Sequence, residues 1–391
     1  MITSIVRYEQ GKQKPVRVAV LQRVLPQYRV ALLKALSTEF DGALRIFIGK
    51  DISNSKVRSA KHFEGLDVVT LPTRHFLVGG RVLTNHIGLV NKLKEFRPDV
   101  IICEGESNIL NYLKVILYFK VFSQQTVVIH WSLGGLPGAA PIGRLKQFSK
   151  RILLSLFDSY IVYSSFGKDA LIRLNCDPKK ITVAVNVSDT SKHIQQSLAL
   201  APRKHELRAK LGLPDQFTVI YVGDFSPDKR VELLIEAVVA SRSNPFNMLL
   251  IGDGVKFDEI KQRVAEAKLD HVFMPGRLGW EALADYYVAS DLFVLPGLGG
   301  MVISEAMAFG LPVLVHQADG CELDLVIQDE TGYRLTTGDA TEIYACIDAL
   351  RQRPQKLAYL GASARSLVAN TFTIKATAKS IQSAVFRSIS S

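Results

Sequence analysis

The feature that most limits what this chain can fold into is an alternation of short apolar strands with helical segments. In the first half, strand patterns cover residues 16–21, 44–48, 67–71, 99–103, 126–130 and 159–163. Helical patterns separate them at about 28–36, 85–95, 107–122 and 165–174. Strands that alternate with helices at this spacing form a parallel sheet with helices on both faces.

The same alternation restarts in the second half. Strand patterns lie at 217–222, 247–251, 271–274, 292–295 and 312–315, and helical patterns at 231–241, 257–267, 280–289 and 302–309. Between the halves, residues 187–213 are polar and break the rhythm, so we place an interdomain linker there. The sequence therefore predicts two doubly wound α/β domains, with ligands in a cleft beyond the carboxyl ends of the strands.

The composition excludes several other classes of protein. Hydrophobic residues make up 48% of the 391 and charged residues 22%, so a disordered chain is excluded. Four cysteines without C-x-x-C spacing indicate neither a disulfide framework nor a zinc site, and we predict no metal. The sequence starts without a signal-peptide core and has no run long enough to cross a membrane, which favours a cytoplasmic location.

The charge is distributed unevenly along the chain. Residues 1–200 contain 28 Lys and Arg against 14 Asp and Glu, a net of +14, whereas residues 201–391 contain 20 against 23, a net of −3. This asymmetry indicates that one half faces an anionic surface or substrate. A nucleic-acid partner is disfavoured, because the basic residues are scattered and no nucleic-acid motif is recognised.

The most informative motif is a strand, a glycine turn and a helix start at residues 295–309, LPGLGGMVISEAMAF. Gly299 and Gly300 allow the backbone to approach a ligand closely, and the N–H groups of Met301 and Val302 form an anion site at the helix start. Glu305, one turn further on, is placed to accept hydrogen bonds from two vicinal hydroxyls of a ribose. The alternative interpretation is a strand-to-helix turn without a ligand.

This motif and several others resemble the C-terminal domain of the retaining glycosyltransferases of family 4, which have the GT-B fold of two Rossmann-like domains facing a cleft. The resemblance runs from about Thr218 to the C-terminus and includes YVGDFSPDKRVELLIEA (221–237), LLIGDG (249–254), YYVASDLFVLP (286–296) and ADGCELDLVIQDETG (318–332). It implies an acceptor-binding domain at 1–195, a domain for the nucleotide sugar at 196–372, and a last helix at 373–391 that crosses back to the first domain.

The resemblance also implies a reaction. A sugar is transferred from a nucleotide diphosphate sugar with retention at the anomeric carbon, and with neither a metal nor a cofactor. The family's pyrophosphate-binding lysine is Lys229 here, in the turn that begins at Gly223. Arg230 is either a second phosphate contact or a surface charge, and Arg277 either borders the base or points to solvent.

Two departures from the family pattern concern this donor site. Gly297 stands where the family has a carboxylate that contacts the donor sugar, and Asp224 stands where it has an arginine that helps the lysine. A variant active site is one interpretation. A non-catalytic partner subunit of the same fold is a second, and a nucleotide-sugar epimerase, which needs no acceptor, is a third.

The first half carries weaker signals for the acceptor side. Tyr28 and Arg29, in the turn LPQYRV, resemble a motif of polysaccharide-building members and either contact substrate or pack at a helix start. His130, at the end of a strand, is the catalytic candidate, with a role in positioning or polarising the sugar, and its alternative is a structural histidine. Glu104 and Glu106 follow another strand and either face the cleft or cap a helix.

A basic amphipathic helix is predicted near 144–156, where Arg144, Lys146, Lys150 and Arg151 alternate with apolar residues. It lies either on an anionic membrane surface or with its apolar face in the core. Together with the resemblance, which implies the activity, these observations predict a cytoplasmic glycosyltransferase, peripheral on the cytoplasmic face of a membrane. We expect it to act on a glycan or lipid-linked acceptor in cell-surface polysaccharide or lipopolysaccharide synthesis.

Overall fold

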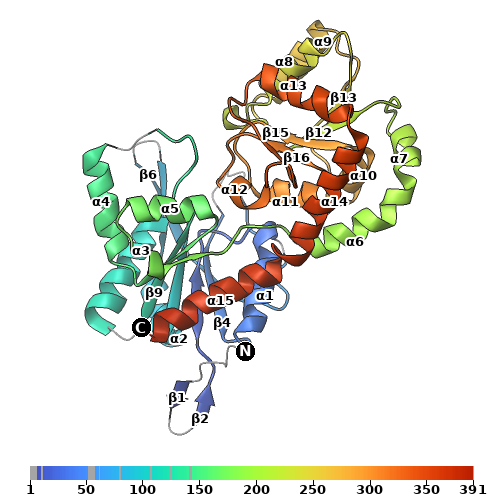
Figure 1. Ribbon diagram of the computed structural model, residues 1–391. Helices are drawn as coiled ribbons and strands as arrows, with labels where there is room; N and C mark the ends of the chain where they lie inside the picture. Colours follow the sequence, from blue (N-terminus) through green and yellow to red (C-terminus); the bar gives the residue numbers. More distant parts are fainter. Residues whose placement is uncertain are drawn as a thin grey trace. The chain divides into compact units, whose positions relative to one another are not determined.

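The chain folds into two compact units (Figure 1). The computed structural model describes residues 7–9, 12–51, 58–60, 62–78, 81–105, 108–123, 126–140 and 143–390. Unit 1 contains residues 1–135, 139–185 and 374–391, and unit 2 contains residues 136–138 and 186–373. Each unit has a parallel sheet of its own.

Unit 1 is built on a seven-stranded parallel sheet. Its strands are, in spatial order, β11 (Ile181–Val183), β10 (Ser159–Val162), β9 (Val127–Ser132), β8 (Val100–Glu104), β3 (Val18–Leu21), β4 (Leu44–Gly49) and β5 (Asp67–Leu71). Val18 and Val20 of β3 face one core, and Ala19 and Leu21 face the other. Because both faces of the sheet are covered, such a strand is a continuous apolar run in the sequence.

Helices cover both faces of this sheet. The core around Val18 is closed by α1 (Gln27–Glu39) and α15 (Ile374–Ser390). The opposite core is closed by α2 (Leu89–Phe96), α3 (Ile109–Ile116), the π-helical segment η2 (Leu117–Ser123), α4 (Arg144–Ser155) and α5 (Ser165–Arg173). Unit 1 also has the 3₁₀ turn η3 (Pro178–Lys180) and two antiparallel hairpins, β1 (Arg7–Glu9) with β2 (Lys12–Lys14) and β6 (Thr73–Val78) with β7 (Arg81–His86).

Unit 2 is built on a six-stranded parallel sheet. Its strands are, in spatial order, β14 (Val272–Gly276), β13 (Asn247–Ile251), β12 (Thr218–Val222), β15 (Leu292–Leu295), β16 (Val313–Val315) and β17 (Gly332–Arg334). Its helices are α6 (Thr190–Leu200), α7 (Lys204–Lys210), α8 (Glu232–Ala240), α9 (Phe257–Glu266), α10 (Trp280–Ala289), α11 (Met301–Ala308), α12 (Glu322–Leu325), α13 (Ala340–Arg351) and α14 (Pro354–Asn370), with 3₁₀ turns η4 (Ala201–Arg203) and η5 (Pro227–Lys229).

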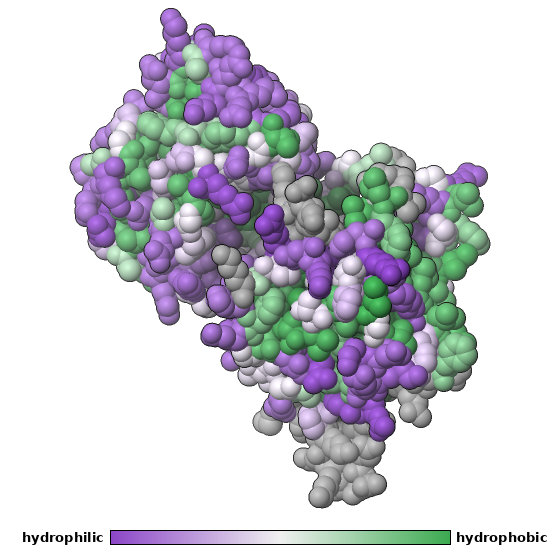
Figure 2. Space-filling view, turned by 180° about the vertical axis from the view of Figure 1, so that it is seen from behind, coloured by the Kyte–Doolittle hydropathy of each residue, from purple (hydrophilic) through white to green (hydrophobic). Residues whose placement is uncertain are grey.

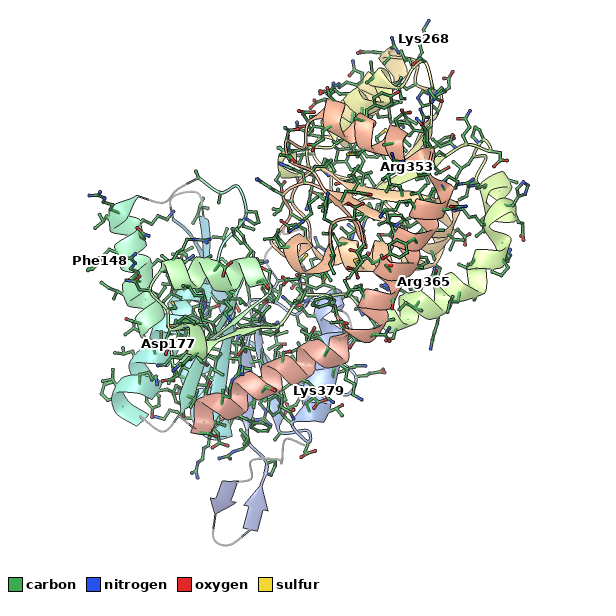
Figure 3. All side chains as sticks on the ribbon, viewed as in Figure 1. Phe148, Asp177, Lys268, Arg353, Arg365 and Lys379 are labelled. Atoms are coloured by element: carbon green, nitrogen blue, oxygen red, sulfur yellow. The ribbon has the colours of Figure 1, made fainter. Side chains whose placement is uncertain are left out.

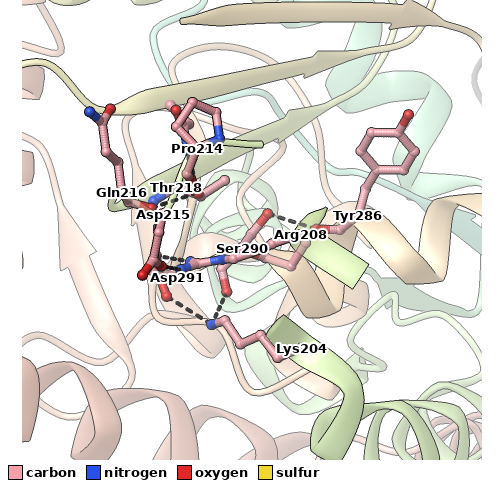
Figure 4. A network of polar contacts seen from close by, with 11 residues as sticks. Lys204, Arg208, Pro214, Asp215, Gln216, Thr218, Tyr286, Ser290 and Asp291 are labelled. Carbon is pink, nitrogen blue, oxygen red and sulfur yellow. Dashed lines mark hydrogen bonds and ion pairs between the residues drawn. The ribbon is translucent and has the colours of Figure 1, made fainter. Parts of the chain in front are cut away.

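A polar network closes the amino end of this second sheet (Figure 4). The carboxylate of Asp291, just before β15, accepts hydrogen bonds from the backbone N–H of Thr218 at 2.8 Å and from Arg208 at 2.6 Å. Lys204 donates to the same carboxylate at 2.8 Å. The network therefore fastens α7 to the two central strands at the edge opposite to their carboxyl ends.

Two segments differ from the prediction. Residues 85–88 are not helical, because β7 pairs with β6 as far as His86 and α2 begins only at Leu89. The predicted linker at 187–213 is largely helical, since α6 and α7 occupy most of it and belong to unit 2. None of the helices in the described part of the chain combines the length and the apolar character needed to cross a bilayer.

Candidate functional site

The strand order of unit 2 identifies where a ligand is expected. From β12 the chain proceeds to β13 and β14 on one side, and it returns to place β15, β16 and β17 on the other side. The crevice beyond the carboxyl ends of β12 and β15 is therefore the topological switch point, where doubly wound sheets bind ligands. The loops at this point are residues 223–231 and 296–300, which contain most of the predicted donor-site residues.

Lys229 joins these two loops. It ends the turn η5, and its Nζ donates a hydrogen bond to the backbone carbonyl of Leu298. The backbone N–H of Leu298 in turn donates to the carbonyl of Asp228 at 2.8 Å. The lysine is partly exposed, and its hydrogen bond to Leu298 holds its ammonium at the switch point.

Gly297 lies where these loops approach most closely. A Cβ atom at this position would stand 2.4 Å from the carbonyl oxygen of Asp228 and 2.7 Å from the backbone of Lys229. Real Cβ atoms do not approach backbone so closely, and backbone cannot give way as a flexible side chain does. The glycine at the expected carboxylate position is therefore required by the packing of the lysine turn.

Helix α11 begins in the same crevice. Its N-cap is Gly300, which has no side chain, and its first turn starts with the partly exposed Met301 and Val302. The Asp319 carboxylate rests against Gly300, where a Cβ would stand 2.0 Å from its Oδ2. Gly299 is constrained by a side chain, since a Cβ added there would stand 3.2 Å from the side chain of Leu295. Asp319 is a member of the site that was not singled out from the sequence.

Glu305 lies one turn into α11. Burial raises the pKa of its carboxyl to about 7, and the neighbouring Tyr287 hydroxyl acts in the opposite direction. The Tyr287 ring stacks on Phe309 at 4.9 Å between centroids, which holds this part of α10 against α11. The preceding residue, Ser304, accepts a hydrogen bond from the backbone N–H of Ser188 at 3.0 Å, which fixes the helix from its other side.

The other predicted donor-site residues lie at different distances from the crevice. Arg230 adopts a left-handed conformation (φ 54°), and its guanidinium contacts Nδ1 of His316 at 3.0 Å. Gly223 begins the β12 turn, where its N–H donates to the carbonyl of Ile251 at 3.0 Å. Arg277 is exposed beyond β14, two strands away from β12.

Three potential metal ligands cluster beside the crevice, Asp319, Cys321 and Glu322. The buried Glu322 carboxylate already accepts backbone N–H bonds from Ala318 at 3.2 Å and Gly320 at 2.7 Å. Burial raises the pKa of the Cys321 thiol well above its usual range, which disfavours the thiolate that a metal would need. The arrangement suits a hydrogen-bonded loop better than a cation site.

Unit 1 has its own switch point, between β3 and β8. A half-open pocket of about 170 Å³ lies there, lined by Arg23, Val24, Pro26, Tyr28, Arg29, Glu104 and Gly105. Two of the lining residues, Tyr28 and Arg29, were predicted for the acceptor side, and Tyr28 is the exposed one (47%).

Arg29 is held at the base of this pocket by a buried ion pair. Its guanidinium donates to the Glu104 carboxylate at 3.1 Å and to the Tyr163 hydroxyl at 2.5 Å, and Tyr163 donates to the same carboxylate at 2.5 Å. The guanidinium also lies 5.1 Å from the Trp131 ring centroid. Burial opposes its charge, but Tyr163 and Glu104 raise its pKa above the ordinary value, so Arg29 stays cationic. Glu106 lies outside the described residues.

His130 lies within β9, two residues before the strand ends. Its ring packs 4.9 Å from Phe157 and 6.1 Å from Tyr112, and its Nδ1 contacts Ser132 Oγ at 3.3 Å. Burial, with a smaller effect of Lys150, lowers the pKa of this histidine to about 4. The imidazole is therefore neutral at pH 7, and it is surrounded by side chains of the unit 1 core.

Residues 203–367, within unit 2, match the profile of the family described as "Glycosyl transferases group 1". The chain is also similar to the sulfoquinovosyl transferase SQD2 of Arabidopsis thaliana, with 31% identity over 157 residues, and to the alpha-D-kanosaminyltransferase of Streptomyces kanamyceticus, with 27% over 180 residues. These matches cover 38% and 44% of this chain, and 29% and 46% of the two relatives. The chain thus spans less than half the length of these curated relatives.

Among solved structures, the chain is similar to HepE of Anabaena in complex with UDP, with a TM-score of 0.73 and 18% identity over 95% of this chain and 100% of that one. It is also similar to the sucrose-phosphate synthase of Thermosynechococcus elongatus, with a TM-score of 0.70 and 20% identity over 95% and 98% of the two chains. The predicted fold class is confirmed, because the two Rossmann-like α/β domains match structures of the GT-B fold.

Proposed function

We propose that this chain is a retaining glycosyltransferase, which moves a hexosyl group from a nucleotide diphosphate sugar to a glycan or lipid-linked acceptor. The observation that carries the proposal is the meeting of Lys229, the start of α11 and Glu305 at the switch point of unit 2. This crevice lies inside the segment that matches the glycosyl transferase profile.

The chemistry follows from the charge that develops on the departing diphosphate. A fixed ammonium and the N–H groups of Met301 and Val302 stabilise that charge without reorganising during the reaction. The ionised Glu305 carboxylate accepts hydrogen bonds from ribose hydroxyls. With this positive charge in place, the proposed step needs neither a metal nor a cofactor.

Three further residues have smaller proposed roles in the donor site. Gly223 lets the backbone of the β12 turn approach the nucleotide. Arg230, next to Lys229, supplies a second positive charge near the phosphates, with His316 fixing its direction. Arg277 borders the base, and its exposed side chain contributes little to binding energy.

On the acceptor side we propose the pocket at the switch point of unit 1. Tyr28 offers an exposed ring on which a sugar can stack, and Arg23 offers a cation to an anionic group of the acceptor. Arg29 is committed to Glu104 and Tyr163, so it positions the pocket wall and does not supply a free charge. His130 is neutral and enclosed by the unit 1 core, so its proposed role, positioning a sugar by hydrogen bonding, rests on the family resemblance.

The proposed acceptor determines where in the cell the reaction is proposed to take place. We propose a role in cell-surface polysaccharide or lipopolysaccharide synthesis, on the cytoplasmic face of a membrane. SQD2, one of the similar proteins, is named as a sulfoquinovosyl transferase, and other relatives are named for teichuronic acid and capsular polysaccharide synthesis.

The test is a screen of UDP, GDP, ADP and dTDP, and of their sugars, for a rise in melting temperature. A ligand that binds only the folded state adds about 2.7 kcal/mol of stability at one hundred times its dissociation constant. We expect one base to stabilise the protein, and Lys229→Ala and Glu305→Ala to lose the shift. Lys268→Ala and Glu281→Ala, at exposed positions of the same unit, are the matched controls.

Each outcome of the screen bears on the proposal. If no nucleotide shifts the wild type, the donor site is absent, and a non-catalytic partner subunit becomes the better interpretation of Gly297 and Asp224. If a nucleotide sugar binds but is isomerised without any acceptor, the protein is an epimerase. Transfer of the sugar to an acceptor with retention of the anomeric configuration supports the complete proposal. NMR of the product measures that configuration.

A further inference from the structure

Helix α4 of unit 1 turns its apolar side outward. Leu145, Phe148, Ile152 and Leu156 recur every three or four residues and are 83%, 60%, 50% and 40% exposed. Phe148, marked in Figure 3, lies on the outer side of the helix. The apolar face of this helix is therefore not in the core, and Leu154 is its buried residue.

A second helical segment of unit 1 has the same property. Along α3 and η2, Leu113, Leu117, Val121 and Phe122 are 45%, 59%, 56% and 72% exposed. Single exposed apolar residues are ordinary on protein surfaces, whereas a contiguous set marks an interaction site. We call the outward side chains of these two segments the α3–α4 surface.

The two segments are neighbours. Their inward residues Tyr112, Phe119, Leu154 and Phe157 belong to one core cluster, so both segments cover the same face of the sheet. Lys120 of η2 also forms an ion pair with Asp158, just after α4. Figure 2 shows green, apolar atoms gathered along the outer edge of unit 1.

The charge of these segments has a single sign. They contain the basic residues Lys114, Lys120, Arg144, Lys146, Lys150 and Arg151, and their sequences ILNYLKVI, LYFKVFS and RLKQFSKRILLS contain no Asp or Glu. Apolar side chains flanked by cations match the boundary between anionic headgroups and acyl chains. A second copy of the chain would present the same positive charge and be repelled.

From these observations we infer that the α3–α4 surface docks unit 1 on an anionic lipid bilayer. The apolar side chains enter the headgroup boundary, and the exposed side chains of Arg144 and Lys146 contact lipid phosphates. The contact lies in the plane of the membrane surface, and neither segment crosses the bilayer. This inference does not depend on the transferase activity, because it requires only the surface itself.

The test is sedimentation of the full chain with vesicles of phosphatidylcholine alone or with 30% phosphatidylglycerol. We expect binding only to the anionic vesicles, weakened when the salt rises from about 0.1 to 0.5 M. Leu145→Ser with Phe148→Ser should weaken binding at least tenfold. Arg144→Gln with Lys146→Gln should weaken it about twenty-five-fold, since each charge contributes roughly fivefold.

Matched controls separate docking from unfolding. Val255→Ser with Tyr359→Ser removes exposed apolar groups from unit 2, and Lys261→Gln with Lys268→Gln removes exposed charges there. All four double variants should melt as the wild type does, and the two controls should keep wild-type vesicle binding. The inference is overturned if the wild type does not bind anionic vesicles, or if the surface variants bind these vesicles as tightly as the wild type does. Self-association without lipid that Phe148→Ser abolishes would overturn it in favour of a protein interface.

Discussion

Gly297 illustrates how one residue fixes the geometry around Lys229. Adding a Cβ there would place it 2.4 Å from the Asp228 carbonyl, so the two loops must separate. We expect Gly297→Ser to cost about 1–3 kcal/mol of unfolding free energy and to reduce the nucleotide-induced rise in melting temperature. Gly279→Ser, with no atom within 4 Å of its Cβ among those described, is the control. Equal urea midpoints for both variants would contradict the steric explanation.

Glu305 should make stability and binding depend on pH in opposite directions. Burial raises its pKa from 4.5 to about 7 in the folded state, so the folded protein binds more protons between these values. Stability from this group is complete below pH 4.5 and falls as the pH rises through 7, by about 3 kcal/mol in total. Nucleotide affinity should rise over the same range, because in the proposed donor site the ionised carboxylate accepts hydrogen bonds from the ribose hydroxyls.

Urea unfolding and nucleotide titration from pH 5 to pH 8 measure both effects. In Glu305→Gln the stability loss above pH 6 should shrink relative to the wild type, and the pH dependence of affinity should decrease. Glu281→Gln, at an exposed position of α10, should leave both curves unchanged. Parallel stability curves for the wild type and Glu305→Gln would show that the carboxyl is not perturbed.

The sequence predicted part of the candidate site at this scale. Lys229, the glycine turn and Glu305 were accessible because they lie in short, contiguous motifs. Asp319 was missed because its contact with Gly300 spans 19 residues and depends on how β15 and β16 pair. The partners of Arg29 are 75 and 134 positions away, so only the folded sheet identifies the ion pair with Glu104.

At the scale of elements, buried polar residues explain what was missed. The sequence of α6 predicts a linker because Thr190, His193 and Ser197 occupy the buried face of this helix in place of apolar residues. Thr190 and Ser197 are satisfied there by the carbonyls of Val368 and Phe309. The strands were predicted well because their residues are buried on both faces, which leaves a continuous apolar signal.

Periodicity also left the orientation of α4 undecided. A 3.6-residue pattern shows that a helix has an apolar face, but it does not show whether protein or another medium covers that face. In the structure Leu145 and Phe148 are exposed, so the protein itself does not cover this face.

The Asp291 network should affect stability without affecting the nucleotide. Asp291→Ala leaves Arg208, Lys204 and the Thr218 N–H without their shared acceptor at the amino end of the sheet. Removing one partner of a partly buried charged network costs about 2–4 kcal/mol, whereas the nucleotide-induced shift should persist. Glu206→Ala, which breaks an exposed ion pair with Arg203, should hardly change the melting temperature. If Asp291→Ala abolished the nucleotide-induced rise in melting temperature, the network would be part of the nucleotide-binding site.

At the scale of the whole molecule, the chain contributes residues 136–138 to unit 2, crosses into that unit again after Val185 and returns to unit 1 at Ile374. Each unit has its own sheet and core, and the excess positive charge is concentrated in the sequence of the first. The proposed acceptor pocket and the α3–α4 surface both belong to this positive unit, while the proposed donor crevice belongs to the other. Binding of lipid and binding of nucleotide should therefore be separable by variants.

Helix α15 gives a test of that separation. Ala378, Ile381 and Val385 are buried in the unit 1 core, and Gln382 donates to the α1 carbonyl of Glu39 at 2.5 Å. Deleting 374–391 removes burial worth on the order of 5–10 kcal/mol, comparable to the whole stability of a domain. Calorimetry should show loss of the unit 1 transition, while the remaining transition still rises with nucleotide. Lys379→Ala, an exposed change in the same helix, should keep both transitions, and disappearance of the nucleotide-sensitive transition on deletion would contradict independent donor binding.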